Sequence, residues 1–243
     1  MVKNKIILFD LDDTLFDSTF IRKKIWDNQS EIILKYLNIN LSKEKILQLI
    51  GNSYYEANKN ENLMEKVLIN KLEDKIQNKI QKEIIDELNK VKNQIYSSII
   101  PYEKVIETVQ WLTNEGFELG IASAGLLEHQ LMKIKYLNLN KYFKANLIFV
   151  SEELNGTLKK DVLFFRKIKD KVKYDPTNTQ IYMVGDKPSQ DIVSPIIAGY
   201  DKCFLLMNYH YEKEKNILNQ IDRSKYITIK NISDIIGYFY DEL

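Results

Sequence analysis

Two hydrophobic patterns alternate along this chain of 243 residues. The first is a short, continuous apolar run, which is typical of a strand buried on both faces of a parallel sheet. The second places apolar residues three and four positions apart, which predicts amphipathic helices. Runs of the first kind lie at 5–9, 117–122, 147–150, 180–184 and 202–207, and a last strand is expected from Tyr226 onward.

Helices are expected between these strands, at 103–114, 128–137, 162–172 and 190–198. Gly116 and Gly199 follow the first and the last of them, where glycine commonly ends a helix. Strands that alternate with helices predict right-handed crossovers and a mainly parallel sheet covered on both faces. The predicted fold class is therefore α/β, with a three-layer, Rossmann-like core.

One long stretch departs from this alternation. From about residue 19 to residue 97 the chain has helical periodicity and no proline, which predicts an insert of about four helices. One apolar stripe of the insert runs from Leu72 to Ile95, Ser42 suits an N-cap, and Pro101 closes the insert. The predicted domains are an α/β core at 1–16 and 98–243 and an all-helical domain at 17–97.

The charge and the hydropathy of the chain argue against nucleic acids and membranes as partners. Lys and Arg number 35 and Asp and Glu number 34, so the chain lacks the basic footprint of a protein that binds nucleic acid or anionic membranes. The first apolar run is interrupted at Asp10, unlike a signal peptide, and no apolar stretch approaches the roughly 20 residues of a membrane span. We expect a cytoplasmic protein with neither kind of partner. Cys203 is the single cysteine and is expected in the core.

Polar residues stand at or after the ends of four predicted strands. In open α/β sheets, ligands bind at the carboxyl ends of the strands, near the point where the strand order reverses. These residues therefore form a candidate site as a set. They are Asp10 and Asp12 after the first strand, Ser123 after the second, Lys159 after the third, and Asp186 with Asp191 after the fourth.

Asp10 and Asp12 are two positions apart, so their side chains project the same way from an extended segment. Crowded carboxylates repel each other unless a cation or a shared proton relieves the repulsion. With Asp186 they make a cluster of oxygen ligands that contains no His or Cys, and such a cluster suits Mg²⁺. The expected cofactor is therefore Mg²⁺.

Four motifs of this sequence resemble those of the haloacid dehalogenase-like superfamily, in the right order and with similar spacing over nearly the whole chain. Residues 9–15 resemble its first motif, Asp-x-Asp-x-Thr, which includes Thr14. Ser123 resembles the second motif. The third and fourth are represented by Lys159 with Asp161 and Phe165, and by Gly185-Asp186 with Asp191. Within the superfamily the chain looks most like small phosphatases whose helical cap lies between the first two motifs, as the residues 17–97 do here.

The resemblance implies a mechanism for a phosphatase. Asp10 would attack phosphorus and form an aspartyl-phosphate, and Asp12 would act as acid and then as base, for which a raised pKa is expected. Mg²⁺ would be held by Asp10, Asp186 and the backbone carbonyl of Asp12. Ser123, Ala124 and Lys159 would bind the phosphate, and Thr14 and Asp191 would support the metal site.

The second and third motifs depart from the family pattern. Lys160 is adjacent to Lys159 and replaces one of the family's prolines, and the spacing to Asp161 and Phe165 favours Lys159. The second motif reads Ser123-Ala124-Gly125, so it lacks a polar side chain often found there, although backbone N–H groups can still bind phosphate. Asp13 and His210 are expected to be solvent-exposed, capping or packing residues.

The leading hypothesis is an enzyme that removes phosphate from a small phosphorylated metabolite. A haloacid dehalogenase and a phosphomutase are alternatives from the same superfamily. A catalytically weak interaction protein that uses the helical insert is an alternative from another class. Asp12 argues against the dehalogenase, because halide departure needs no proton. The sequence leaves the oligomeric state open between monomer and homodimer.

Overall fold

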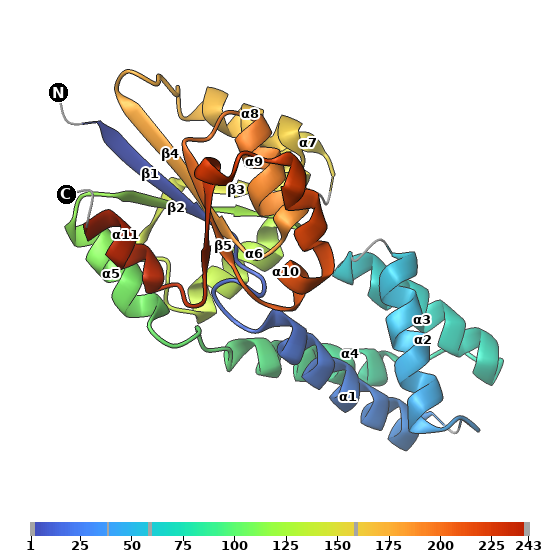
Figure 1. Cartoon of the computed structure of the whole chain (residues 1–243). Helices are drawn as coiled ribbons and strands as arrows, with labels where there is room; N and C mark the ends of the chain where they lie inside the picture. The colour runs from blue at the N-terminus through green and yellow to red at the C-terminus, as the bar shows by residue number, and fades with distance from the viewer. Residues whose placement is uncertain (1–2, 38, 58–59, 158–159, 241–243) are drawn as a thin grey trace. The chain divides into compact units, whose positions relative to one another are not determined.

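Six strands of the described chain form one parallel sheet in the order β3-β2-β1-β4-β5-β6 (Figure 1). The structure is a computed structural model that describes residues 3–37, 39–57, 60–157 and 160–240. The strands are β1 (Asn4–Phe9), β2 (Glu118–Ser123), β3 (Phe143–Val150), β4 (Thr179–Gly185), β5 (Lys202–Leu206) and β6 (Tyr226–Ile229). The predicted α/β class with a parallel sheet is confirmed.

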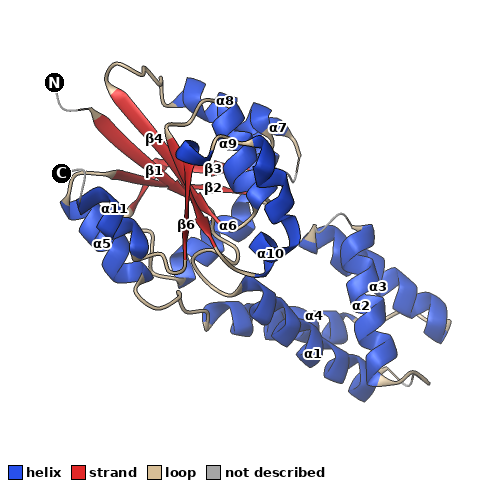
Figure 2. Ribbon diagram, in the orientation of Figure 1, coloured by secondary structure: helices blue, strands red, loops and turns tan. Residues whose placement is uncertain are grey.

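The apolar residues of the strands alternate between two faces, and helices cover both (Figure 2). On one face Leu8 and Met183 pack in a cluster with residues of α8 (Val162–Lys171) such as Phe164. On the other face the ring of Phe239, from α11 (Asp234–Tyr240), lies 5.1 Å from that of Tyr182. The sheet therefore has water-excluding layers on both sides, as continuous apolar strands require. Cys203 is fully buried in the first of these layers, as expected.

The remaining elements around the sheet are short. They are α5 (Val105–Asn114), α6 (Leu127–Tyr136), α7 (Ser151–Asn155), α9 (Ser194–Ile197), α10 (Tyr209–Glu214), the π-helical turn η1 (Pro188–Val193), and the 3₁₀ turns η2 (Lys215–Gln220) and η3 (Arg223–Lys225). The sequence predicted α5, α6 and α8 to within a few residues. It missed α7 and α10, which are too short to show an apolar period.

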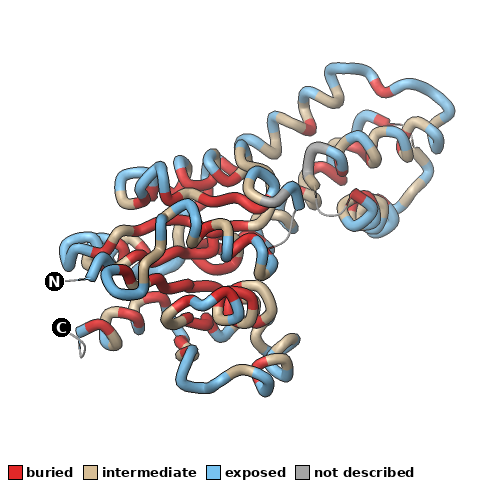
Figure 3. The backbone as a smooth tube through the Cα atoms, turned by 90° about the horizontal axis from the view of Figure 1, so that it is seen from above, coloured by how far each residue is buried: buried red, intermediate tan, exposed pale blue. Residues whose placement is uncertain are grey.

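A second compact unit comprises Ser18–Ile99, and the first comprises the residues up to Asp17 and from Ile100 onward. The second unit is helical, with α1 (Ser18–Tyr36), α2 (Lys43–Glu56), α3 (Glu61–Ile76) and α4 (Lys82–Ser97). It has its own apolar core, drawn as buried segments in Figure 3. Ser42 caps α2 by accepting a hydrogen bond from the backbone N–H of Lys45, as predicted.

The apolar stripe from Leu72 to Ile95 belongs to two helices. Gln77 ends α3 in the left-handed conformation, with φ of 55°, and α4 begins five residues later. Leu72, Ile80 and Leu88 are all buried in the core of the helical unit, so the stripe keeps its packing role across the break. No helix in the described ranges is both long enough and apolar enough to cross a membrane.

Candidate active site

The strand order reverses beside β1, and the residues that follow β1, β2 and β4 meet at the carboxyl edge of the sheet. Asp10 follows β1 directly and is held there by a hydrogen bond from its backbone N–H to the carbonyl oxygen of Val184, at 2.8 Å. Asp186 follows β4, and Ser123 is the last residue of β2. The parallel pairing of β1 with β2 and with β4 therefore brings three of the predicted site residues to one edge.

Asp10 is the most constrained of these residues. It is 2% exposed, its Oδ1 lies 2.7 Å from Nζ of Lys160, and its Oδ2 has no hydrogen-bond partner in the described parts of the chain. Burial raises the pKa of Asp10 to about 7; Asp191 adds to the rise, whereas Lys160 opposes it. One oxygen is thus fixed by a cation, while the other is buried and available to a ligand.

Lys160 lies beside Asp10. Its Nζ lies 2.7 Å from Asp10 and 2.5 Å from Oδ1 of Asp191, and the residue is 2% exposed. Burial works to lower the pKa of Lys160, but Asp10 and Asp191 raise it above its usual value, so the group is a cation. Lys159, which the motif spacing favoured, lies outside the described residues. Asp161 caps α8 by accepting from the N–H of Phe164, and this cap fixes Lys160 just before the helix.

Asp186 and Asp191 complete a buried acidic cluster with Asp10, in which one oxygen from each lies within 4.8 Å of the others. Oδ2 of Asp191 accepts hydrogen bonds from the backbone N–H groups of Asp186 and Lys187, at 3.1 and 2.9 Å. Oδ1 of Asp186 accepts from the hydroxyl of Thr14 at 3.3 Å. Burial raises the pKa of Asp186, and Asp191 adds to the rise.

This cluster fits a divalent cation. Asp10, Asp186 and Asp191 are buried carboxylates of like charge, and Oδ2 of Asp10 lacks a partner in the described chain. All three contribute oxygen, which Mg²⁺ prefers over nitrogen and sulfur ligands. The donor set therefore fits a divalent cation that prefers oxygen ligands.

Two side chains of α6 bind the carboxylate of Asp12. Its Oδ1 and Oδ2 lie 2.8 and 3.0 Å from Nζ of Lys133, and Nε2 of Gln130 donates to Oδ2 at 3.3 Å. Burial works to raise the pKa of Asp12, but the charge and hydrogen bonds of Lys133 outweigh it and the pKa lies below its usual value. The expectation of a raised pKa is therefore wrong for the protein without substrate, because the fold brings Lys133 to Asp12 from more than a hundred positions away.

The second-motif residues Ser123 and Ala124 lie beside these groups. Ser123 is 1% exposed, and its hydroxyl donates to the carbonyl oxygen of Ala124 at 3.4 Å. That carbonyl also accepts from Nε2 of Gln130 at 2.6 Å. Gly125, with φ of 118°, donates its N–H to the hydroxyl of Ser151 at 3.4 Å. The phosphate-binding role of Ser123 and Ala124 remains a prediction.

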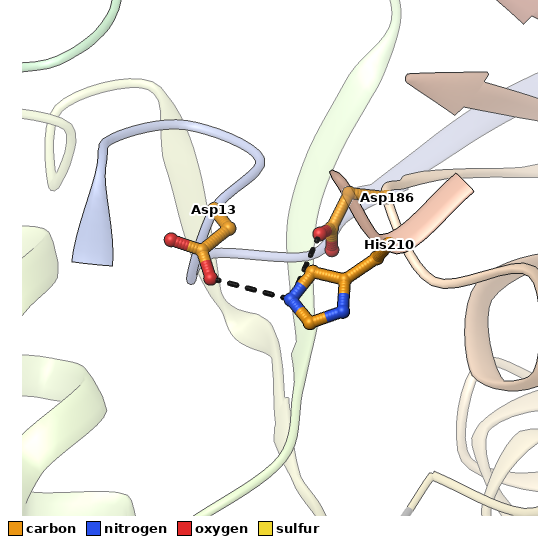
Figure 4. A group of neighbouring side chains, drawn as sticks. All are labelled: Asp13, Asp186 and His210. Carbon is orange, nitrogen blue, oxygen red and sulfur yellow. Dashed lines mark ion pairs between the residues drawn. The ribbon is translucent and has the colours of Figure 1, made fainter. Parts of the chain in front are cut away.

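Two residues that we expected to be peripheral lie against the acidic cluster. Asp13 is 8% exposed, and Nε2 of His210 lies 3.6 Å from its Oδ2 and 3.9 Å from Oδ2 of Asp186 (Figure 4). Asn208, which caps α10, donates to Asp186 at 2.9 Å. Asp13 is therefore buried, so the expectation of a solvent-exposed residue is wrong, and His210 packs against the acidic cluster. Both His210 and Asn208 follow the end of β5. The rule that identified the other site residues, a polar side chain just after a strand, would also have identified these two.

Two curated relatives are named glyceraldehyde 3-phosphate phosphatase. The one from Methanopyrus kandleri is 25% identical over 196 residues, covering 80% of this chain and 81% of the relative. The one from Methanothermobacter thermautotrophicus is 23% identical over 195 residues, covering 80% and 82%.

Solved structures with this fold carry more than one activity in their titles. A HAD phosphatase from Thermococcus onnurineus has a TM-score of 0.66 at 18% identity and covers 97% of both chains. A 2-haloacid dehalogenase from Pseudomonas syringae has a TM-score of 0.65 at 20% identity and covers 100% of both. The profile of the haloacid dehalogenase-like hydrolases matches residues 4–199. The chain therefore belongs to the haloacid dehalogenase-like hydrolase family.

Proposed function

We propose that this chain is a Mg²⁺-dependent phosphatase that removes phosphate from a small phosphorylated metabolite, with Asp10 as its nucleophile. The main support for this proposal is the environment of Asp10. One of its carboxylate oxygens is bound to Lys160, and the other is buried without a hydrogen-bond partner in the described chain. Lys160 favours the ionised carboxylate that a nucleophile must be. The names of the two curated relatives support a small phosphomonoester as the substrate class.

In the first step, an oxygen of Asp10 bonds to phosphorus while the bond from phosphorus to the leaving oxygen breaks, which forms an aspartyl-phosphate. The leaving oxygen takes a proton from Asp12. Asp12 is held as a carboxylate by Lys133 in the free protein, and the negative charge of an arriving phosphate favours its protonated form. In the second step a water attacks phosphorus, Asp12 accepts its proton, and phosphate leaves Asp10 as a free carboxylate.

Mg²⁺ would be held by Asp10, Asp186 and the backbone carbonyl of Asp12, with Thr14 and Asp191 orienting that site. It would screen the carboxylate from the phosphate oxygens and stabilise the transferring group. Lys160, the Ser123 hydroxyl and the backbone N–H of Ala124 would bind the phosphate oxygens. We propose the helical unit Ser18–Ile99 as the cap that selects the rest of the substrate and excludes water.

The test is phosphate release from p-nitrophenyl phosphate and from a panel that includes glyceraldehyde 3-phosphate, phosphoglycolate, sugar phosphates and nucleoside monophosphates. Each substrate is assayed with Mg²⁺ and with EDTA, for the wild type and for Asp10→Asn, which keeps the side chain's size. Release that requires metal and disappears in the variant supports the proposal. Equal release by both proteins contradicts the role of Asp10.

Two further outcomes would favour the alternatives within the family. Metal-independent release of halide from a 2-haloacid would indicate a dehalogenase. Conversion of a sugar 1-phosphate without net release of phosphate would indicate a phosphomutase. No turnover of any substrate would leave an interaction protein as the better hypothesis.

A further inference from the structure

Two side chains of α6 contact the site without a role in the mechanism described above. Lys133 approaches both carboxylate oxygens of Asp12, at 2.8 and 3.0 Å. Gln130 donates to one of these oxygens at 3.3 Å and to the carbonyl oxygen of Ala124 at 2.6 Å. The two residues are three positions apart on one helix, so they share a face that is turned to the first motif.

The contact is buried and closely packed, unlike a surface ion pair. Lys133 is 6% exposed and Gln130 is 3% exposed. A Cβ on Gly125 would lie 2.8 Å from Nε2 of Gln130, so the end of this side chain packs against the backbone of the second motif. At Ala124, where that motif lacks a polar side chain, Gln130 donates to the backbone carbonyl oxygen. A buried lysine is costly unless it has a fixed partner, and Asp12 is that partner.

The two carboxylates of the first motif are therefore bound by different lysines from different elements. Lys160, before α8, binds Asp10, and Lys133, near the end of α6, binds Asp12. Asp10, the proposed nucleophile, and Asp12, the proposed acid and base, therefore do not share a lysine. Because Lys133 reaches both oxygens of Asp12, one oxygen stays bound to it while the other gives or takes a proton.

We infer that Lys133 is a positioning residue that orients the Asp12 carboxyl group toward the leaving oxygen of the substrate, with Gln130 fixing the same group to the second motif. The inference rests on the proposed phosphatase function. Lys133 acts through Asp12 and does not bind the phosphate itself. Its loss misdirects proton transfer to the leaving oxygen and leaves the attack by Asp10 in place.

Leaving-group chemistry separates this role from a structural one. An alkyl phosphate has a poor leaving oxygen that needs a proton, whereas p-nitrophenolate leaves without one. The expected result for Lys133→Met is a loss of about 100-fold in kcat/KM on an alkyl phosphate such as glycerol 3-phosphate, and less than tenfold on p-nitrophenyl phosphate. Lys133→Arg, which keeps the charge and two donors, restores much of the alkyl phosphate activity.

The pair is tested directly by a double-mutant cycle on kcat/KM for the alkyl phosphate. In an Asp12→Asn background, Lys133→Met causes no further loss if Lys133 acts through Asp12. The matched control is Lys135→Met, an exposed lysine of the same helix, which leaves both activities unchanged. Thermal unfolding of each variant shows whether it is folded at the assay temperature.

Three results would overturn the inference. Equal losses on both substrates with a raised KM would mean that Lys133 binds phosphate. Unchanged kinetics with a lowered melting temperature would mean that the ion pair only fastens α6 to the first motif. Additive losses in the double variant would mean that the two residues act independently. If the wild type releases phosphate from neither substrate, or if Asp10→Asn is as active as the wild type, the proposed function fails and the inference falls with it.

Discussion

Asp10 is 2% exposed, and one of its oxygens accepts no hydrogen bond from the described chain, so its negative charge is costly in the folded protein. Its pKa of about 7 lies above the ordinary value of 3.8. Between those two pH values the folded state holds a proton that the unfolded state has released. The free energy of unfolding therefore falls as pH rises from about 4 to about 7, and it stays at the lower value above that range.

Asp10→Asn should remove this cost in the metal-free protein. We expect urea unfolding in EDTA at pH 8 to show a variant more stable than the wild type, by on the order of a few kcal/mol, and a much smaller difference at pH 4.5. Asp74→Asn, at an exposed position of α3, is the control and should show no such pH dependence. A variant less stable than the wild type at pH 8 would contradict the prediction.

The two adjacent lysines of the third motif can be separated by the same substitution at each. We expect Lys160→Met to lower kcat/KM for p-nitrophenyl phosphate by about 100-fold or more, because it removes the cation 2.7 Å from Asp10. Lys159→Met should keep the activity within about threefold of wild type if Lys160 alone of the two binds the phosphate. The reverse result would return the phosphate-binding role to Lys159, which the motif spacing favoured.

At the scale of elements, the sequence predicted the groups that stand on strand ends and missed those on helix faces. Asp10, Ser123 and Asp186 were found because a parallel sheet brings its carboxyl ends together. Lys133 is one of many lysines with helical spacing, and nothing in the chain relates it to Asp12, more than a hundred positions earlier. The choice between Lys159 and Lys160 depended on a loop geometry that residue spacing cannot resolve to one position.

Two element boundaries differ from the predicted ones for local reasons. The third strand was expected at 147–150, but β3 begins at Phe143, which is buried and pairs with Leu119 of β2. The three residues after Phe143 are exposed and include Lys144 and Asn146, so the apolar run in the sequence begins only at Leu147. The helix expected at 190–198 is replaced by the turn η1 followed by α9. The π-helical turn carries Asp191, whose carboxylate accepts the backbone N–H groups at the end of β4.

The register shift between β2 and β3 occurs beside Gly120, where the strands lie very close. A Cβ at this position would lie 2.3 Å from the backbone oxygen of Leu147 and 2.8 Å from Cδ2 of Leu8. Neither neighbour can yield easily, since one is backbone and the other is a core side chain. The glycine is needed here for space, because its φ is not in the left-handed region.

Gly120→Ala should therefore destabilise the protein by about 3 kcal/mol, or prevent folding, in urea unfolding monitored by circular dichroism. Gly237→Ala is the matched control, because no atom lies within 4 Å of the added Cβ and the residue is in α11. Its expected effect is a gain of up to about 1 kcal/mol from helix propensity. A Gly120→Ala protein as stable as the wild type would show that the strands can separate at no cost.

At the scale of the whole molecule, the fold alone does not decide the reaction. Solved structures entitled phosphatase and dehalogenase match this chain about equally well, with TM-scores of 0.66 and 0.65. What favours phosphate chemistry here is local: Asp12 beside the nucleophile position, and the acidic cluster formed with Asp186 and Asp191. The net charge of the whole chain is only +1, yet the site contains several carboxylates. Lys160 and Lys133 partly neutralise their negative charge.

The central position of β1 has a consequence for how the chain is made. This strand is synthesised before both of its neighbours, because Ile6 pairs with Glu118 and Asn4 pairs with Thr179. At roughly 5 to 20 residues per second, an apolar segment waits about 10 to 35 seconds for its second partner. The helical unit Ser18–Ile99 is contiguous and can fold during that interval. Nascent chains stalled before residue 179 should therefore expose at least one unpaired edge of β1, which attracts chaperones.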